Sequence, residues 1–240
     1  MNEENFEMST DENRNQFGSS ANYLDYVLLH QLAEFAPKRI VDFGAGEGKN
    51  GKLIRSVFKN DCEIIAVEGY EPTANMLKTA GIYDEVHHSL IQKWLQENTK
   101  QYDLAVFGDV LEHLTSREIH QAVKTALTCF ERIIIVVPLY DLYQDEMYGN
   151  PLEIHKSFIT GKCFDRYHPL EKHIRVGRNE TGEGYTIMNV FITRKRRRES
   201  FLRRLELGVI RFWVPLLEPI GLGRAFISFL QFVKKRILNR

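Results

Sequence analysis

Glycines at alternate positions directly follow a short apolar run near residue 40, and they are the first feature that suggests chemistry. The segment 40–54 reads IVDFGAGEGKNGKLI, with Gly44, Gly46 and Gly48 in alternation and Gly51 after them. A glycine turn between a strand and a helix exposes backbone N–H groups, and the helix dipole adds positive potential at the same place. The pattern therefore predicts a site for a small molecule that carries an anionic group.

The ligand of this turn is open between several classes. Gly46-x-Gly48-x-x-Gly51 fits the dinucleotide fingerprint, and Glu68 follows at the spacing of a ribose ligand. A turn with a purely structural role is a further alternative. Asp42, two residues before the first glycine, would repel a pyrophosphate but could accept hydrogen bonds from an ammonium group. A molecule with an amine, a carboxylate and a ribose therefore fits better, and S-adenosylmethionine has that shape.

Strands and helices alternate around this turn. The expected strands are 39–43, 63–69, 85–90, 102–109 and 132–138, and the expected helices are 20–36, 51–58, 72–81 and 115–130. Thr115 and Glu118 have the spacing of a capping box at the start of the last helix. Strands that are apolar on both faces and alternate with helices predict an α/β fold with a Rossmann-like, doubly wound, mostly parallel sheet. An antiparallel hairpin around the Gly-rich loop 179–184 is expected to finish the sheet.

A second motif lies at the end of the fourth expected strand. Residues 102–114 read YDLAVFGDVLEHL. Together with the glycine turn after Asp42, this segment resembles the class I S-adenosylmethionine-dependent methyltransferase superfamily. The resemblance covers residues 40–138 and extends loosely to the final hairpin. It implies a methyltransferase that binds S-adenosylmethionine.

The resemblance also implies which residues bind the cofactor. They are Asp42, Gly44, Ala45, Gly46, Glu68, Gly69, Ser89, Leu90, Asp109 and Val110. Asp42 and the turn would line the methionine half, and Glu68 would accept hydrogen bonds from both ribose hydroxyls. Gly69 would let the adenosine pass close by, and Asp109 and Val110 would lie near the donor methyl group. Ser89 and Leu90 stand where many relatives carry an acidic residue that faces the adenine.

The acceptor side is expected in the loops after the fourth and fifth strands, because ligands of open parallel sheets lie beyond the carboxyl ends of the strands. Residues 139–175 form a long, weakly periodic insertion, which predicts a lid over the substrate. A hydroxyl acceptor must lose a proton, and the candidate bases are His155, then His113, then Asp141. Each candidate also has a structural alternative, such as His155 holding the loop in place.

Structural roles are open for the neighbouring carboxylates as well. Asp109 and Glu112 have capping-box spacing, which would explain both without a ligand. Histidine together with a carboxylate could also bind a metal, but no HxxxH or comparable spacing supports it, so no metal site is expected. Cys62, Cys129 and Cys163 are widely spaced, so no disulfide framework is expected.

The two ends of the chain differ in charge. Residues 1–19 are acidic and polar and are expected to be disordered. Residues 194–240 hold 13 basic and 3 acidic residues in an amphipathic helical pattern, although the net charge of the whole chain is zero. Such a helical extension is typical of a segment that lies on an anionic membrane surface. Docking on the sheet or on a second subunit is the alternative, and a nucleic-acid partner is not expected.

The segment YGNPLEIHKS, residues 148–157, resembles a stretch of bacterial methyltransferases associated with surface-glycan assembly. That likeness implies a glycan or a lipid-linked saccharide as the methyl acceptor, and a cytoplasmic protein that is peripheral on the inner membrane face. Three alternatives remain at this stage: a small lipophilic acceptor such as a quinone precursor, an NAD-dependent oxidoreductase, and a partner protein that binds the cofactor without catalysis.

Overall fold

A computed structural model describes residues 25–140, 144–147, 149–178 and 184–194. The acidic segment 1–19, the candidate base Asp141 and the basic tail beyond Arg194 lie outside these residues. Within the described part of the chain, no helix has the length and apolar character needed to cross a membrane.

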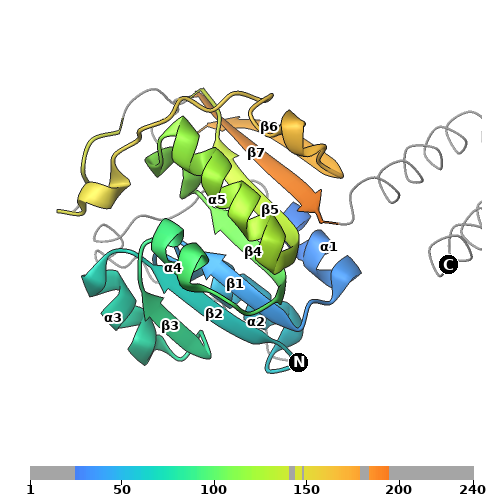
Figure 1. The fold of residues 1–240 in the computed structure, drawn as a ribbon, viewed down its shortest axis with the longest axis vertical. Coiled ribbons are helices and arrows are strands. Elements are labelled where there is room, and N and C mark those ends of the chain that lie inside the picture. Colours follow the sequence, from blue (N-terminus) through green and yellow to red (C-terminus); the bar gives the residue numbers. More distant parts are fainter. Residues whose placement is uncertain (1–24, 141–143, 148, 179–183, 195–240) are drawn as a thin grey trace, which may run out of the picture.

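A single mixed sheet forms the centre of the molecule (Figure 1). Its strands are β1 (Arg39–Phe43), β2 (Glu63–Glu68), β3 (Glu85–His88), β4 (Tyr102–Gly108), β5 (Phe130–Pro138), β6 (Glu171–Arg178) and β7 (Gly184–Thr193). Their order is β3-β2-β1-β4-β5-β7-β6. The first five strands in this order are parallel, and β7 runs antiparallel to both β5 and β6. The predicted doubly wound sheet with a C-terminal antiparallel hairpin is confirmed.

Helices cover both faces of the sheet because alternate strand residues point to opposite sides. The helices are α1 (Asp25–Phe35), α2 (Lys49–Phe58), α3 (Glu71–Ala80), α4 (Ile91–Glu97) and α5 (Ser116–Cys129). Apolar residues of α1, α2 and α3 pack with Ile40, Ile64 and Val106 on one face. Those of α4 and α5 pack with Phe43 and Phe107 on the other. Strands β1, β2, β4 and β5 are thus buried on both sides, which explains their largely apolar sequences, whereas the edge strand β3 is partly exposed.

Helix α4 was not predicted from the sequence. It has only seven residues, and its N-cap, Leu90, makes no side-chain capping bond, so local signals for it are weak. Ile91, Trp94 and Leu95 bury one face of this helix. The Trp94 ring packs edge-on against Phe43, with ring centroids 5.4 Å apart. Tertiary packing therefore stabilises a helix that intrinsic propensity alone would not.

Several predicted boundaries shift. Helix α2 begins at Lys49, before the predicted start, because Gly48 already serves as its N-cap. Strand β3 ends at His88, so Ser89 and Leu90 belong to the turn before α4. Strand β5 starts at Phe130, directly after α5. The predicted capping box of Thr115 and Glu118 is present at α5.

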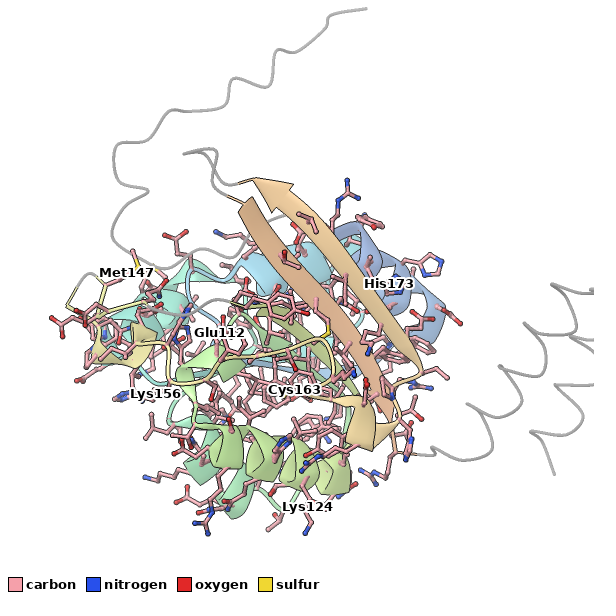
Figure 2. The ribbon with its side chains drawn as sticks, turned by 90° about the horizontal axis from the view of Figure 1, so that it is seen from above. Glu112, Lys124, Met147, Lys156, Cys163 and His173 are labelled. Carbon is pink, nitrogen blue, oxygen red and sulfur yellow. The ribbon has the colours of Figure 1, made fainter. Side chains whose placement is uncertain are left out.

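The insertion after β5 crosses the carboxyl edge of the sheet as irregular chain with two short 3₁₀-helices, η3 (Pro151–Glu153) and η4 (Asp165–Tyr167). In Figure 2 it runs from Met147 at one side of the molecule past Lys156 to Cys163. Ile159 and Phe164 anchor it in the core that α4 and α5 share. Strand β6 begins at Glu171, so residues 171–175 belong to the sheet and not to the lid that the sequence predicted.

Candidate active site

The glycine turn lies where the strand order reverses, between β1 and β4. At such a switch point the loops after the two strands diverge to opposite faces, which opens a crevice for ligands. Gly44 has a φ of +67°, and a Cβ at this position would overlap the side chain of Val110. The turn after β1 and the loop after β4 therefore touch each other, and only a residue without a side chain fits between them.

Glu68 lies at the end of β2 with its carboxylate directed at the turn. Oε2 accepts a hydrogen bond of 3.0 Å from the N–H of Gly46, and Oε1 accepts one of 2.8 Å from the N–H of Tyr70. The side chain is 7% exposed. The carboxylate is thus held by the backbone on both sides, at the carboxyl end of β2 beside the turn. Its role as a ribose ligand stays a prediction that this position supports.

Asp42 is completely buried beneath the turn. The Tyr83 hydroxyl donates to its Oδ2 at 2.7 Å, and Nδ2 of Asn50 donates to its Oδ1 at 3.3 Å. Burial raises the pKa of Asp42 from 3.8 to about 7, although both hydrogen bonds favour the ionised form. The carboxylate links β1, α2 and the chain before β3. Direct contact with a ligand ammonium group, as the sequence suggested, remains a prediction.

The expected adenosine side is lined by apolar groups. A Cβ at Gly69 would lie 2.8 Å from Cδ1 of Leu152 and 3.2 Å from Cδ2 of Leu90. The insertion therefore reaches across the sheet edge and closes over the end of β2. Leu90 is half exposed, whereas the Ser89 hydroxyl donates to the carbonyl of Leu90. Leu90 and Leu152 thus meet over Gly69, and the predicted contact of Leu90 and Ser89 with the adenine stays a prediction.

Asp109 and Val110 follow β4. Asp109 has a φ of +45°, a left-handed conformation that is uncommon for a residue with a side chain and that is often found at functional sites. Its N–H donates to the carbonyl of Val136 at 2.9 Å. Val110, not Asp109, is the N-cap of the 3₁₀-helix η2 (Leu111–His113), and no side chain caps this helix. The structure therefore does not show the alternative capping box of Asp109 and Glu112.

The insertion brings His155 to His113. Their ring centroids are 5.0 Å apart with planes tilted by 58°. One ligand atom of each ring and one carboxylate oxygen of the buried Glu112 lie within 4.8 Å of one another. Figure 2 shows Glu112 in the interior, beneath the insertion. Two of the three predicted bases therefore meet beside the loop that covers the glycine turn, and the third, Asp141, lies outside the described residues.

Burial keeps the imidazole of His113 neutral. It lowers the pKa of His113 from 6.5 to about 4, and the positive charge that His155 can carry acts in the same direction. The carbonyls of Ile154 and Glu153 favour the protonated form but do not outweigh these effects. Burial also raises the pKa of Glu153, helped by the charge of Glu68. At neutral pH this corner of the site therefore holds an uncharged imidazole.

Four residues lie at the site although the sequence did not predict them there. Tyr83 and Asn50 hold Asp42, and their contacts cross between elements that no local pattern connects. Glu153 places Oε2 3.9 Å from Nε2 of His113. Glu112 was seen only as a possible cap. The segment DVLEH contains Glu112 and was the one sequence signal for its role. A carboxylate next to a histidine is unusual in a short apolar turn that is buried.

The described residues fit a nucleoside that carries an amino acid. Val110 packs directly on Gly44, Glu68 places a carboxylate beside Gly46, and Leu90 and Leu152 place apolar groups against Gly69. The N–H groups of Gly44, Gly46 and Gly48 bond to Val67, Glu68 and Ala45, which fixes the turn at the N-terminus of α2.

Comparisons with known proteins agree with this geometry. Solved structures that share the fold include TehB from Haemophilus influenzae, with a TM-score of 0.54, 14% identity, and coverage of 70% of this chain and 61% of TehB. The N-terminal domain of EvdMO1 with SAH bound has a TM-score of 0.52 and 14% identity, over 72% of this chain and 82% of that domain. The plantazolicin methyltransferase BpumL in complex with SAH has a TM-score of 0.51 and 11% identity, over 70% of this chain and 81% of BpumL.

At these identities the solved structures show a common fold, and the chain spans less than two thirds of TehB. A search of the curated proteins finds no match. The model of a family described as a methyltransferase domain matches residues 20–175, which include every strand from β1 to β5, the whole insertion and the start of β6. The chain belongs to this methyltransferase-domain family.

Proposed function

We propose that this chain is an S-adenosylmethionine-dependent methyltransferase whose acceptor is a hydroxyl group of a glycan or a lipid-linked saccharide. The observation that carries the proposal is the meeting of His113 and His155 beside Val110, which itself packs on the cofactor turn at Gly44. When bound, S-adenosylmethionine supplies a methyl group on a positively charged sulfur. A hydroxyl acceptor has to lose its proton during attack on that group, and basic side chains at this place suit the requirement.

The chain's own residues divide the task. Glu68 and the turn at Gly44 and Gly46 bind and orient the cofactor, which fixes the position of the reacting methyl group. Leu152 and the insertion cover the crevice and exclude water. His155 takes up the hydroxyl proton at a ring nitrogen. The neutral state of His113 avoids a like charge beside a cationic cofactor.

The acceptor side is polar and carries an aromatic surface. Tyr140 and Phe158 lie at the carboxyl end of β5 with ring centroids 6.0 Å apart, and both side chains are about half exposed. Such rings can stack on the apolar face of a sugar or on a quinone precursor. The carboxylates of Glu112 and Glu153 near the histidines favour the saccharide, because its further hydroxyls can donate to them. The likeness of residues 148–157 to glycan-associated methyltransferases supports the same choice.

A transfer assay with radiolabelled S-adenosylmethionine tests the function. The full chain is offered lipid-linked and free oligosaccharides in one series, and hydroquinones and phenols in another. We expect label in the saccharide fraction, as methyl ethers by mass spectrometry, and its loss in His155→Ala. Label only in the phenol series would replace the acceptor class. Absence of transfer to either series, with cofactor binding intact, would favour a partner protein without catalysis.

We also propose that residues 195–240 hold the enzyme on the inner face of the cytoplasmic membrane. The support is the excess of basic over acidic residues in this segment and its amphipathic pattern. Deletion of residues 195–240 is expected to release the protein from sedimenting phosphatidylglycerol vesicles while cofactor binding is kept. Vesicle binding that survives the deletion would contradict the anchor.

A further inference from the structure

Glu112, His113 and His155 form a set of side chains that the sequence did not connect. Glu112 and His113 lie on η2, whereas His155 follows η3 in the insertion. One nitrogen of each imidazole and one oxygen of the carboxylate lie within 4.8 Å of one another. Two imidazoles and a carboxylate on one centre are a common ligand set for metal ions in enzymes that leave further coordination positions open.

Backbone contacts hold the two parts of this set in a fixed relation. The N–H groups of Lys156 and Ser157 donate to the carbonyl of Glu112 at 2.9 and 3.1 Å. The Ser157 hydroxyl donates to the carbonyl of Leu114. On the other side, the N–H of His155 donates to the carbonyl of Gln144 at 3.1 Å. The insertion is thus attached to η2 by the backbone of residues that carry or adjoin the three side chains, which is the preorganisation that a metal site needs.

A carboxylate stands behind one of the imidazoles. Oε2 of Glu153 lies 3.9 Å from Nε2 of His113, and Oε1 of Glu153 accepts a hydrogen bond of 3.1 Å from Nδ2 of Asn150. Nδ1 of His113 is buried. Metal-binding histidines usually have a carboxylate or carbonyl at the ring nitrogen that does not bind the ion, which fixes the ring and increases its basicity. Glu153 lies on that side of His113, 3.9 Å from Nε2 and so beyond direct hydrogen-bond distance.

We propose that Glu112, His113 and His155 bind a divalent first-row transition-metal ion, which takes the acceptor hydroxyl as a further ligand. Nitrogen-rich sets favour ions such as Mn²⁺, Fe²⁺, Co²⁺ and Zn²⁺ over Mg²⁺, which prefers oxygen ligands. A bound divalent ion lowers the pKa of a coordinated hydroxyl and positions its oxygen. The role in catalysis rests on the proposed methyl transfer, whereas metal binding itself does not.

The chemical balance of the step is simple. The acceptor O–H bond breaks, and its proton passes to water. The oxygen lone pair forms the new bond to the methyl carbon while the carbon–sulfur bond breaks, and the sulfur keeps that electron pair. No oxidant or reductant is needed. In this arrangement His155 serves as a metal ligand, so the metal replaces it as the group that activates the hydroxyl.

Metal binding can be measured without any acceptor. The full chain, free of any histidine tag, is treated with a chelator, dialysed and titrated with Co²⁺, Mn²⁺ or Zn²⁺. Bound metal is determined by mass spectrometry, and the Co²⁺ absorption spectrum reports nitrogen coordination. The variants are His155→Ala and Glu112→Gln. The control is His173→Ala on β6, an exposed histidine that Figure 2 places well away from Glu112.

We expect a single ion per chain in the wild type and in His173→Ala, and an affinity lower by more than about tenfold in His155→Ala. Absence of bound metal in the folded wild type, or equal affinity in His155→Ala, would overturn the proposal. Thermal unfolding shows whether the variants fold. If Glu112→Gln does not fold, the Co²⁺ spectrum of the wild type still tests whether nitrogen ligands hold the ion. Cofactor binding is measured in parallel. A chain that binds cofactor and transfers methyl groups after chelation refutes the catalytic role of the metal and leaves the methyltransferase function in place.

Discussion

Replacement of Glu68 by glutamine tests the cofactor site at its best-defined side chain. Glu68→Gln keeps the shape, and its amide oxygen can still accept the bond from the N–H of Gly46 that now measures 3.0 Å. The amide nitrogen cannot accept the second backbone bond, from the N–H of Tyr70 at 2.8 Å, so thermal unfolding is measured alongside to separate this loss from the loss of charge. The charge that would strengthen hydrogen bonds from ribose hydroxyls is lost. A hydrogen bond to a charged group contributes about 1.5–3 kcal/mol, so the dissociation constant of S-adenosylhomocysteine should rise about 10- to 150-fold.

Titration calorimetry measures this change, and two comparisons isolate the ribose contact. An analogue that lacks the ribose 2′-hydroxyl should lose less affinity from Glu68→Gln than S-adenosylhomocysteine does, because the contact is already absent. Glu71→Gln, an exposed carboxylate in the first turn of α3, is the matched control and should bind as the wild type does. Unchanged affinity in Glu68→Gln, or an equal loss for both ligands, would refute the ribose assignment.

Three further predictions concern the turn and its buried groups. Gly44→Ala should abolish cofactor binding because its Cβ overlaps Val110. The control, Gly81→Ala, has the same φ of +67° but open space around it and should bind the cofactor normally. Equal cofactor binding by both variants would contradict the close packing of Val110 on the turn. The raised pKa of Asp42 means that its ionisation costs stability as the pH rises from about 4 through 7. Asp42→Asn should therefore gain unfolding temperature relative to the wild type between pH 5 and 8, and a constant difference would disprove the buried carboxyl. The lowered pKa of His113 acts in the opposite sense, so the stabilising contribution of this histidine is complete above pH 6.5 and is lost towards pH 4. His113→Asn should therefore flatten the acid side of the profile of stability against pH. An unchanged slope would argue against the burial of His113.

The parts of the fold that depend on local patterns could be predicted from the sequence. Strand β1 and the turn after it are marked by an apolar run and by glycines, and α5 is marked by the capping box at Thr115. Each signal lies within a few residues of the element that it predicts. The sheet order then follows from the alternation of strands and helices, which allows few topologies.

The parts of the site that depend on the course of the insertion could not be predicted. His155 meets Glu112 and His113 only because the chain after β5 returns across the sheet and bonds to η2. Leu152 reaches Gly69 in the same way. Asp42 was expected to face a ligand, but whether a buried carboxylate binds side chains or a ligand depends on Tyr83 and Asn50, which come from other elements. Periodicity and motif spacing carry no information about such contacts.

The choice between S-adenosylmethionine and a dinucleotide decides the account as a whole. Titration calorimetry of the full chain with S-adenosylhomocysteine and, separately, with NADH measures it directly. We expect binding of S-adenosylhomocysteine by the wild type, weakened in Glu68→Gln, and no heat of binding with NADH. Binding of NADH together with no response to S-adenosylhomocysteine would contradict the methyltransferase assignment of the site.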